Sequence, residues 1–195
     1  MSKTKMKKVG LTGVMGAGKS SVIEILKEKA IPVLDCDRIN EALLQVDHAG
    51  YLGLVATFSD QILNDQKQLD KQKMSDMIFC DPIKKQRAEA ILHPLIKTEI
   101  ENKMAALTQY PLVVVEVPLL FEIHWESYFD EIWVVASEES ILLERLSKFR
   151  HVSKEEAKRR LAVQMPQQEK IARADVVLWN NEDKEALRKQ IIALL

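Results

Sequence analysis

The stretch "LTGVMGAGKSS", Leu11–Ser21, decides the fold of this chain. It satisfies the pattern G-x-x-x-x-G-K-[ST] through Gly13, Gly18, Lys19 and Ser20. Glycines at such positions let backbone N–H groups turn toward a phosphate without clashes of a Cβ atom. The apolar run before the stretch predicts a strand, and "KSSVIEILKEK" at its end predicts a helix. The arrangement of strand, loop and helix therefore predicts a phosphate-binding loop.

The ligand expected on this loop is a nucleoside triphosphate with Mg²⁺. The ammonium of Lys19 should reach the β and γ phosphates, and the hydroxyl of Ser20 should bind the Mg²⁺ that bridges them. A glycine-rich turn with a solvated lysine is the structural alternative. The residues expected to bind the nucleotide are Gly13, Val14, Met15, Gly16, Ala17, Gly18, Lys19, Ser20 and Ser21.

Composition indicates an ordinary globular protein. The chain has 195 residues, of which 47% are hydrophobic and 29% charged, and this length suits one domain over 1–195. Its net charge of −1 gives no basic footprint for nucleic acid or an anionic membrane. We expect a cytoplasmic protein, because no apolar run is long enough for a signal peptide or a membrane span. Cys36 and Cys80 match no metal-ligand spacing.

Short apolar runs alternate with stretches of helical periodicity along the chain. Most of these runs lack polar alternation, as expected for parallel strands that are covered on both faces. The pattern predicts a three-layer α/β/α sandwich with a mainly five-stranded parallel sheet. The expected strands are Lys7–Thr12, Ile31–Asp35, Leu112–Val117, Glu131–Ala136 and Asp175–Trp179.

Capping signals set several helix boundaries. Ser153 is followed three residues later by Glu156, which predicts a helix that begins there and ends before the next proline, at position 166. Asp81 and Pro82 predict the start of another helix, which Pro94 should kink or divide. The segment from about 39 to 107 is mostly helical and too long for a simple crossover. We expect it to be an insertion that shapes a substrate pocket.

Carboxylates follow two of the expected strands. Asp35 and Asp37 come where the second strand ends, and one of them could orient or deprotonate an attacking hydroxyl. Either could instead cap the following helix. Glu116 ends the third strand and could contact Mg²⁺ through water or cap a loop, and Glu122 adds a carboxylate farther along.

Four arginines cluster late in the chain, on two predicted helices and the turn that joins them: Arg145, Arg150, Arg159 and Arg160. These helices could form a lid, at about 138–166, in which arginines neutralise charge on the triphosphate. Arg159 and Arg160 could equally form pairs with glutamates four residues earlier, whereas Arg150 lies in the turn and is the stronger candidate for a functional role.

Taken in order, the motifs resemble those of the dephospho-CoA kinase family. They are "VGLTGVMGAGKSS", "IPVLDCDRI", "IFCDP" with "ILHPLI", "EVPLLFE", "ERLSKFR", "RRLAVQM" and "ARADVVLWNN". The resemblance runs nearly end to end and implies a P-loop kinase fold with a CoA-binding part and a lid. It implies that ATP phosphorylates the 3′-hydroxyl of the dephospho-CoA ribose, giving CoA and ADP.

The resemblance also implies roles for individual residues. Asp37 matches the family's catalytic base, and Arg150 matches the lid arginine that contacts phosphate, so the expected catalytic set is Asp37, Lys19 and Arg150. Asn180 lies where the family contacts the adenine of ATP. His93, in "LHPLI", and Leu119, in "EVPLLFE", fall in parts associated with the acceptor, although His93 could equally be a packed histidine at a helix kink.

The sequence departs from the family pattern at four positions. Val14 and Ala30 stand where glycine is usual, Glu116 where aspartate is common, and Glu182 where glycine commonly follows the asparagine pair.

Two alternative functions remain open from the sequence. One is a kinase of the same fold that acts on nucleoside monophosphates. The other is a GTP-dependent switch, for which "DHAG" fits D-x-x-G at Asp47–Gly50 but within a predicted helical stretch.

Overall fold

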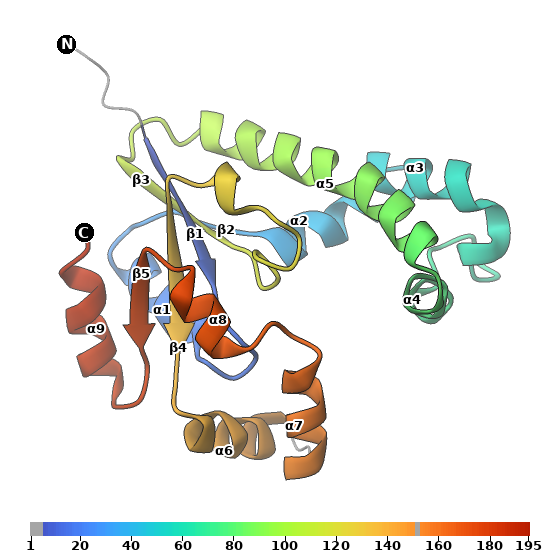
Figure 1. Ribbon diagram of the computed structural model, residues 1–195. Helices are drawn as coiled ribbons and strands as arrows, with labels where there is room; N and C mark the ends of the chain where they lie inside the picture. The colour runs from blue at the N-terminus through green and yellow to red at the C-terminus, as the bar shows by residue number, and fades with distance from the viewer. Residues whose placement is uncertain (1–5, 151–152) are drawn as a thin grey trace. The chain divides into compact units, whose positions relative to one another are not determined.

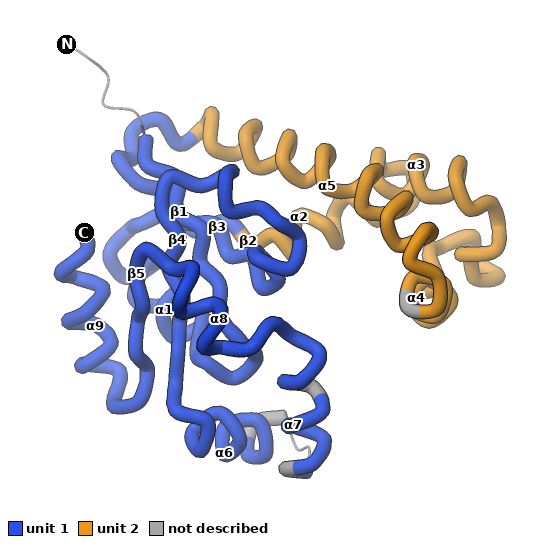
Figure 2. Tube along the Cα trace, in the orientation of Figure 1, with its two compact units in different colours: residues 1–34, 107–195 blue, residues 35–106 orange. Residues whose placement is uncertain are grey.

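The computed structural model describes residues 6–150 and 153–195, without the side chains of Phe79, Phe149, Arg150, Lys154 and Arg160. The described chain forms two compact units, shown in different colours in Figure 2. The first comprises Met1–Leu34 and Leu107–Leu195, and the second is Asp35–Ala106. The second unit covers nearly the same residues as the expected helical insertion.

A five-stranded sheet forms the centre of the first unit (Figure 1). Its strands are β1 (Lys7–Thr12), β2 (Val33–Asp35), β3 (Leu112–Glu116), β4 (Glu131–Ala136) and β5 (Val176–Trp179). Their order in the sheet is β2-β3-β1-β4-β5. β1 pairs in parallel with β3 and β4, and β4 pairs in parallel with β5, so the phosphate-binding loop leaves the central strand of the sheet.

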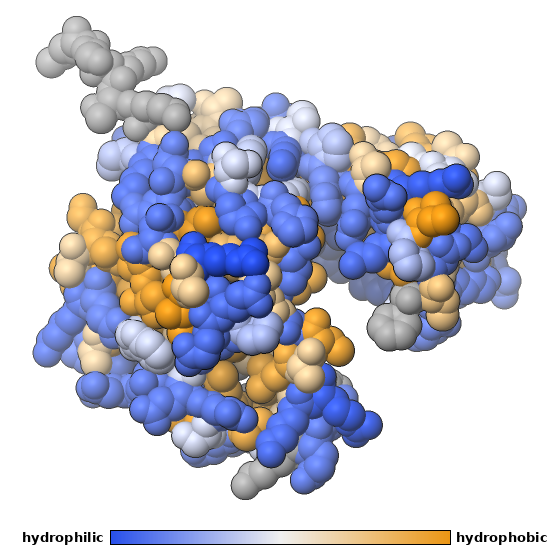
Figure 3. Space-filling model, viewed as in Figure 1, coloured by the Kyte–Doolittle hydropathy of each residue, from blue (hydrophilic) through white to orange (hydrophobic). Residues whose placement is uncertain are grey.

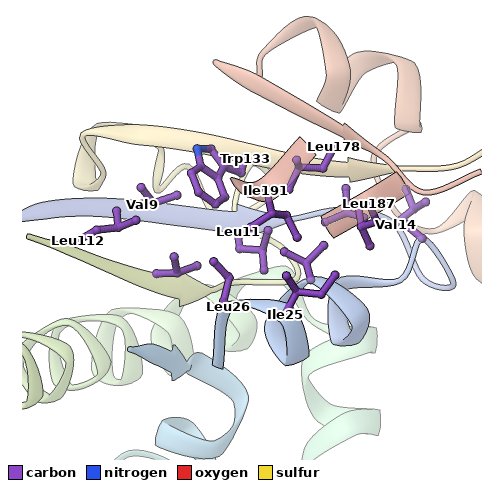
Figure 4. Packing of buried hydrophobic residues seen from close by; sticks show 14 of the residues in the cluster. Val9, Leu11, Val14, Ile25, Leu26, Leu112, Trp133, Leu178, Leu187 and Ile191 are labelled. Atoms are coloured by element: carbon purple, nitrogen blue, oxygen red, sulfur yellow. The ribbon is translucent and has the colours of Figure 1, made fainter. Parts of the chain in front are cut away.

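Strand side chains alternate between the two faces of the sheet, as the two-residue period requires. Figure 4 shows the cluster on one face, where Leu11 and Trp133 pack with Ile25, Leu26 and Ile191 from helices. The other face is also closely packed. The side chains of Leu120 and Phe129 lie so near Gly10 of β1 that a Cβ atom added there would clash with them. Burial on both faces explains why the strands read as continuous apolar runs.

Helices cover both faces of the sheet in the first unit. α1 and α9 supply most of the helical residues of the cluster in Figure 4, Leu142 of α6 adds to it, and α8 packs against β4. Their bounds, with those of the remaining helices, are α1 (Lys19–Glu28), α6 (Glu139–Arg150), α7 (Lys154–Ala162), α8 (Gln167–Ala172), α9 (Lys184–Ile192) and the 3₁₀ helix η2 (Glu126–Tyr128). The predicted three-layer α/β/α fold is confirmed.

The second unit consists of helices around a core of its own. Tyr51, Leu54, Phe58, Ile62 and Ala88 are buried together there. The helices are α2 (Cys36–Leu43), α3 (Ala49–Phe58), η1 (Ser59–Ile62), α4 (Lys71–Cys80) and α5 (Pro82–Ala105). No helix within the described residues is both long enough and apolar enough to cross a membrane.

Of the kink or division predicted at Pro94, the division is wrong. α5 runs continuously from Pro82 to Ala105 with Pro94 inside it. Proline removes one backbone hydrogen bond from a helix interior. Buried side chains lie on both sides of it, Ala88 before and Ile96 and Ile100 after, so packing holds the two halves in one helix.

The turn between α1 and β2 contains a residue in an unusual conformation. Ala30 has a φ of 57°, in the left-handed region. The N–H groups of Ala30 and Ile31 donate to the carbonyls of Lys27 and Leu26, which is the pattern of a Schellman motif. Because Pro32 has no N–H group and that of Ile31 is used by the helix end, β2 begins at Val33, two residues later than predicted.

Candidate active site

The phosphate-binding loop requires glycine at two of its positions. Gly13 has a φ of 150°, and a Cβ there would collide with the carbonyl oxygen of Val135 in β4. Gly18 has a φ of 97° and caps α1, and a Cβ there would collide with the side chain of Asn180. An L residue at either position would distort the loop, so Gly13 preserves a close approach to the β4 backbone and Gly18 a close approach to the Asn180 side chain.

Lys19 and Ser20 begin α1, directly after this loop. The Lys19 Nζ donates to the carbonyl oxygen of Gly13 at 2.9 Å, so its ammonium lies over the loop. Ser20 is exposed. Within the loop, Val14 and Ala17 are buried, with exposed fractions of 3% and 0%. The first N–H groups of a helix have no helical acceptor and carry a partial positive charge, so this end of α1 can bind an anion.

A buried polar frame holds the underside of the loop. The Asn180 Nδ2 donates to the carbonyl oxygen of Ala17 at 2.9 Å, and the side chain of Ser137 donates to the carbonyl oxygen of Asn180 at 2.8 Å. Arg145 in α6 donates to the Ser137 Oγ and to the carbonyl oxygen of Asn180, both at 3.0 Å. Asn180 is only 6% exposed, so the structure places its side chain on the loop backbone.

The segment after β3 is tied to the end of β1. The Val117 N–H donates to the carbonyl oxygen of Leu11 at 2.9 Å, and the Thr12 Oγ1 donates to the carbonyl oxygen of Pro118 at 3.1 Å. Leu119 follows with 44% of its surface exposed. The backbone just before Leu119 is therefore held to β1, and Leu119 itself is open to contact. Glu116, at the end of β3, is half-buried.

A buried ion pair lies farther along the same segment. The Lys170 Nζ donates to both carboxylate oxygens of Glu122, at 2.7 and 2.8 Å, and the side chain of Lys170 has no exposed surface. Burial by itself would raise the pKa of Glu122, but the hydrogen bonds from Lys170 and from the Met165 N–H outweigh it and lower the pKa. Glu122 is therefore ionised.

Asp35 and Asp37 have different structural roles at the start of α2. Asp35 is the N-cap of this helix, and its carboxylate accepts a hydrogen bond from the Arg38 N–H at 3.0 Å. Asp37 lies in the first turn of the helix with an exposed side chain. Of the two carboxylates, Asp35 is thus the one with a capping role.

Asp37 lines a pocket in the second unit. The pocket has a volume of about 680 Å³, and its lining includes Asp37, Asn40, Leu44, Leu69, Lys71 and Met74, from α2, α4 and the segments next to them. Among the described residues, the buried Oδ1 of Asn40 has no hydrogen-bond partner within the protein. A pocket lined by apolar side chains and by side chains of both charges suits a ligand of mixed polarity.

His93 lies in α5 of the same unit, one residue before Pro94. It is half-buried, and burial lowers its pKa more than the nearby Glu89 carboxylate raises it. Its side chain is therefore more readily neutral than that of an exposed histidine. His93 is not among the residues that line the pocket beside Asp37.

The segment predicted to form a lid contains α6 and α7. Ser153 caps α7 through the Glu156 N–H at 3.1 Å, as its sequence predicts. Arg159 pairs with Glu156 at 2.9 Å instead of with the expected glutamate four residues earlier, and it is 76% exposed. Arg150 ends α6, and its side chain lies outside the described part of the chain.

Sequence reasoning missed several polar residues of this site. It noted Arg145 only as part of a basic cluster, and it gave no role to Ser137, Gln164 or Lys170. The Gln164 Oε1 accepts a hydrogen bond from the Met15 N–H, across 149 residues. Contacts at such separation leave no spacing pattern in the sequence.

Figure 3 shows hydrophilic residues over much of the visible face, with hydrophobic groups among them. The loop and the pocket described above are therefore distinguished by their local geometry. Comparison with known proteins identifies what that geometry belongs to. The sequence model of a family described as dephospho-CoA kinase matches residues 7–185.

The chain belongs to the dephospho-CoA kinase family. It is 38% identical over 189 residues to the dephospho-CoA kinase of Carboxydothermus hydrogenoformans, and the match covers 96% of this chain and 92% of that protein. It is 36% identical to the dephospho-CoA kinase of Thermosynechococcus vestitus, with 96% and 93% covered.

Solved structures agree with this family assignment. A protein from Thermus thermophilus superimposes with a TM-score of 0.84 at 30% identity, covering 97% of this chain and 96% of that one. Dephospho-CoA kinase from Campylobacter jejuni gives 0.67 at 26% identity, with 96% and 94% covered. The chain is thus an ATP-dependent kinase. The predicted enzyme class is confirmed, and the alternative of a monophosphate kinase is not favoured.

Proposed function

We propose that this chain transfers the γ-phosphoryl group of ATP to the 3′-hydroxyl of the dephospho-CoA ribose, with the first unit binding the donor and the second unit binding the acceptor. The main support for a donor site in the first unit is the loop Gly13–Lys19. The Lys19 ammonium lies 2.9 Å from the Gly13 carbonyl oxygen, over the start of α1. A full positive charge at a helix N-terminus is suited to the β and γ phosphates of ATP.

In this proposal the loop binds and orients the triphosphate. Backbone N–H groups at the start of α1 bind the phosphate oxygens, and Lys19 leaves the Gly13 carbonyl to neutralise the charge that accumulates on the transferred group. On the resemblance to the family, Arg150 is proposed to contribute a second positive charge to the phosphates.

Ser20 is the residue proposed to hold Mg²⁺. Mg²⁺ prefers oxygen ligands and is usually bound by one or two protein groups together with substrate phosphates. The exposed hydroxyl of Ser20 at the start of α1 fits this pattern. When bound, the ion supplies charge neutralisation between the β and γ phosphates.

Asp37 is proposed as the base that receives the proton of the attacking hydroxyl. Its carboxylate is exposed in the first turn of α2 and faces the pocket of about 680 Å³. Because Asp35 caps the helix, the Asp37 carboxylate is not the one required for that structural role. A carboxylate in hydrogen-bond contact with the 3′-hydroxyl would orient it for attack in line with the leaving group.

The pocket beside Asp37 is proposed to bind the rest of the acceptor. Lys71 offers a positive charge for its phosphates, and Leu44 and Met74 offer apolar surface. Leu119 and His93 are proposed to make further acceptor contacts, on the resemblance to the family.

An acceptor-selection assay tests this proposal. Purified protein with ATP and Mg²⁺ is offered dephospho-CoA, AMP, CMP or GMP, and ADP release is followed by a coupled assay. We expect turnover with dephospho-CoA alone and a product phosphorylated at the ribose 3′ oxygen by ³¹P NMR. Turnover of a monophosphate, or phosphorylation elsewhere, would contradict the proposal.

The same assay tests the donor site. Lys19→Ala removes the charge over the loop, and we expect kcat to fall by about 10²–10³-fold. Lys27→Ala, at an exposed position of the same helix, is the matched control and should retain activity. Circular dichroism spectra of both variants should match that of the wild type.

A further inference from the structure

Gln164 joins the end of α7 to the phosphate-binding loop. Its Oε1 accepts a hydrogen bond from the Met15 N–H at 2.9 Å, and Met15 lies between Gly13 and Gly16 in the loop. Its backbone N–H donates to the carbonyl oxygen of Leu161, so the residue continues the last turn of the helix. Gln164 therefore connects a helix of the segment predicted as a lid to the backbone proposed to bind phosphate.

The residues after Gln164 fix its position. The Met165 N–H donates to the Glu122 Oε1 at 3.0 Å, and Lys170, whose side chain is fully buried, holds the same carboxylate. The side chain of Gln167 accepts from the Ser137 N–H at 3.1 Å and donates to the Ser137 carbonyl oxygen at 2.7 Å. These contacts hold the segment 164–170 to the loop after β3 and to the end of β4.

A buried lysine gives this attachment little freedom. An ammonium without exposed surface is costly unless a carboxylate stays beside it, so Lys170 and Glu122 must remain paired as long as the protein is folded. Because Met165 is bound to the same carboxylate, the residue before it is confined to a narrow range of positions. Gln164 is thus positioned by its neighbours rather than by the loop.

The chemistry of glutamine suits this position. An amide oxygen satisfies the Met15 N–H without adding a charge, whereas a glutamate would accept the same hydrogen bond and place a negative charge beside the polyphosphate. A leucine of similar size would leave the N–H without this partner.

We propose that Gln164 is a positioning residue for the phosphate-binding loop, which it holds through Met15 in the conformation that receives ATP, and that the Glu122–Lys170 pair holds Gln164 in place. This inference rests on the proposed binding of the triphosphate by the loop. It assigns to the end of α7 a part in donor binding that is independent of any arginine.

Nucleotide affinity and amide exchange test the role of Gln164. The dissociation constant of ADP is measured by calorimetry, and the exchange rate of the Met15 amide by NMR, for wild type, Gln164→Leu, Gln164→Glu and the exposed control Gln168→Leu. We expect Gln164→Leu to raise the Kd about fivefold, the loss of roughly one hydrogen bond, and to speed Met15 exchange. Gln164→Glu should raise the Kd while Met15 exchange stays slow, because the acceptor is retained. Gln168→Leu should match the wild type in both.

Three results would count against these assignments, and they are distinguishable. A Kd in Gln164→Leu within twofold of wild type, while Lys19→Ala weakens binding strongly, would overturn the role of Gln164 alone. If Lys19→Ala itself binds ADP as tightly as the wild type, the proposed triphosphate site fails, and the inference fails with it. A purely structural role for Gln164 predicts lower thermal stability in Gln164→Leu with unchanged affinity, and this result also counts against the proposal.

Discussion

The phosphate-binding loop and the pocket beside Asp37 are built in different ways. The loop is held from below by buried groups, with Ala17 fully buried and Asn180 and Ser137 hydrogen-bonded beneath it. The pocket is lined by exposed or half-buried side chains. The loop is preorganised by buried hydrogen bonds, whereas the side chains that line the pocket are more open to solvent.

The difference has a physical reason in the ligands proposed for the two regions. A triphosphate is bound through charge and backbone N–H groups, and a loop that is already in position loses little entropy when it binds. An acceptor with apolar, polar and charged parts needs side chains of several kinds. We therefore expect substitutions in the frame of the loop to affect all nucleotides alike, and substitutions in the pocket to affect the acceptor.

The largest effect should come from the carboxylate of the pocket. Asp37→Asn removes the proposed base, and we expect kcat to fall by about 10²–10⁴-fold with little change in the Kd of ATP. Asp35→Asn is the matched control, since asparagine is also a good N-cap, and it should retain most activity. Steady-state kinetics and ATP calorimetry measure both. A loss of this size in Asp35→Asn with none in Asp37→Asn would assign the base to Asp35.

An intermediate effect is expected in the frame of the loop. Asn180→Ala removes the donor to the Ala17 carbonyl oxygen, and we expect a loss of about 1–2 kcal/mol in the free energy of unfolding and weaker nucleotide binding. If the side chain acts through the loop, affinities for ATP and GTP should fall by the same factor. If Asn180 instead recognises adenine, only the affinity for ATP should fall. Denaturant unfolding and calorimetry with both nucleotides separate these outcomes.

The smallest effect concerns His93, in the second unit. Burial lowers its pKa in the folded protein, so the unfolded chain takes up its proton at a higher pH than the folded one. The stability associated with neutral His93 is complete above the ordinary pKa of histidine, near 6.5, and is lost as the pH falls toward the lower folded pKa. Thermal unfolding between pH 8 and pH 5 should therefore show a weaker loss on acidification in His93→Gln than in wild type. Equal losses in both proteins would contradict the burial of His93.

Most of the first unit could be predicted from the sequence, because its signals are local. Strands covered on both faces produce continuous apolar runs, and β1 and β4 have the predicted bounds. The loop pattern is decisive because glycines at positions 13 and 18 are needed for backbone reasons that any sequence with this loop must meet. The cap of α7 at Ser153 is likewise a property of a few adjacent residues.

What could not be predicted depends on contacts between distant parts of the chain. Pro94 breaks a local rule, and only the packing of both halves of α5 shows why the helix continues. Asp35 and Asp37 are equivalent as residue types, and the backbone geometry at the start of α2 decides which one caps it. The buried pair of Glu122 and Lys170 joins residues 48 positions apart, so each looks like a surface charge in the sequence.

The left-handed turn at Ala30 has a consequence for how the chain folds. Its φ of 57° is not one that alanine prefers, so the turn is enforced by the structures that it joins, α1 before it and β2 after it. This is a site of local frustration, where sequence preference and native geometry disagree. Glycine would relieve the strain but would also leave the unfolded chain with more freedom, and the two effects oppose each other in the free energy of unfolding. The turn is followed by β2, which ends at Asp35, the N-cap of α2. The residue at which α2 begins therefore depends on a turn whose conformation α1 and the sheet impose together.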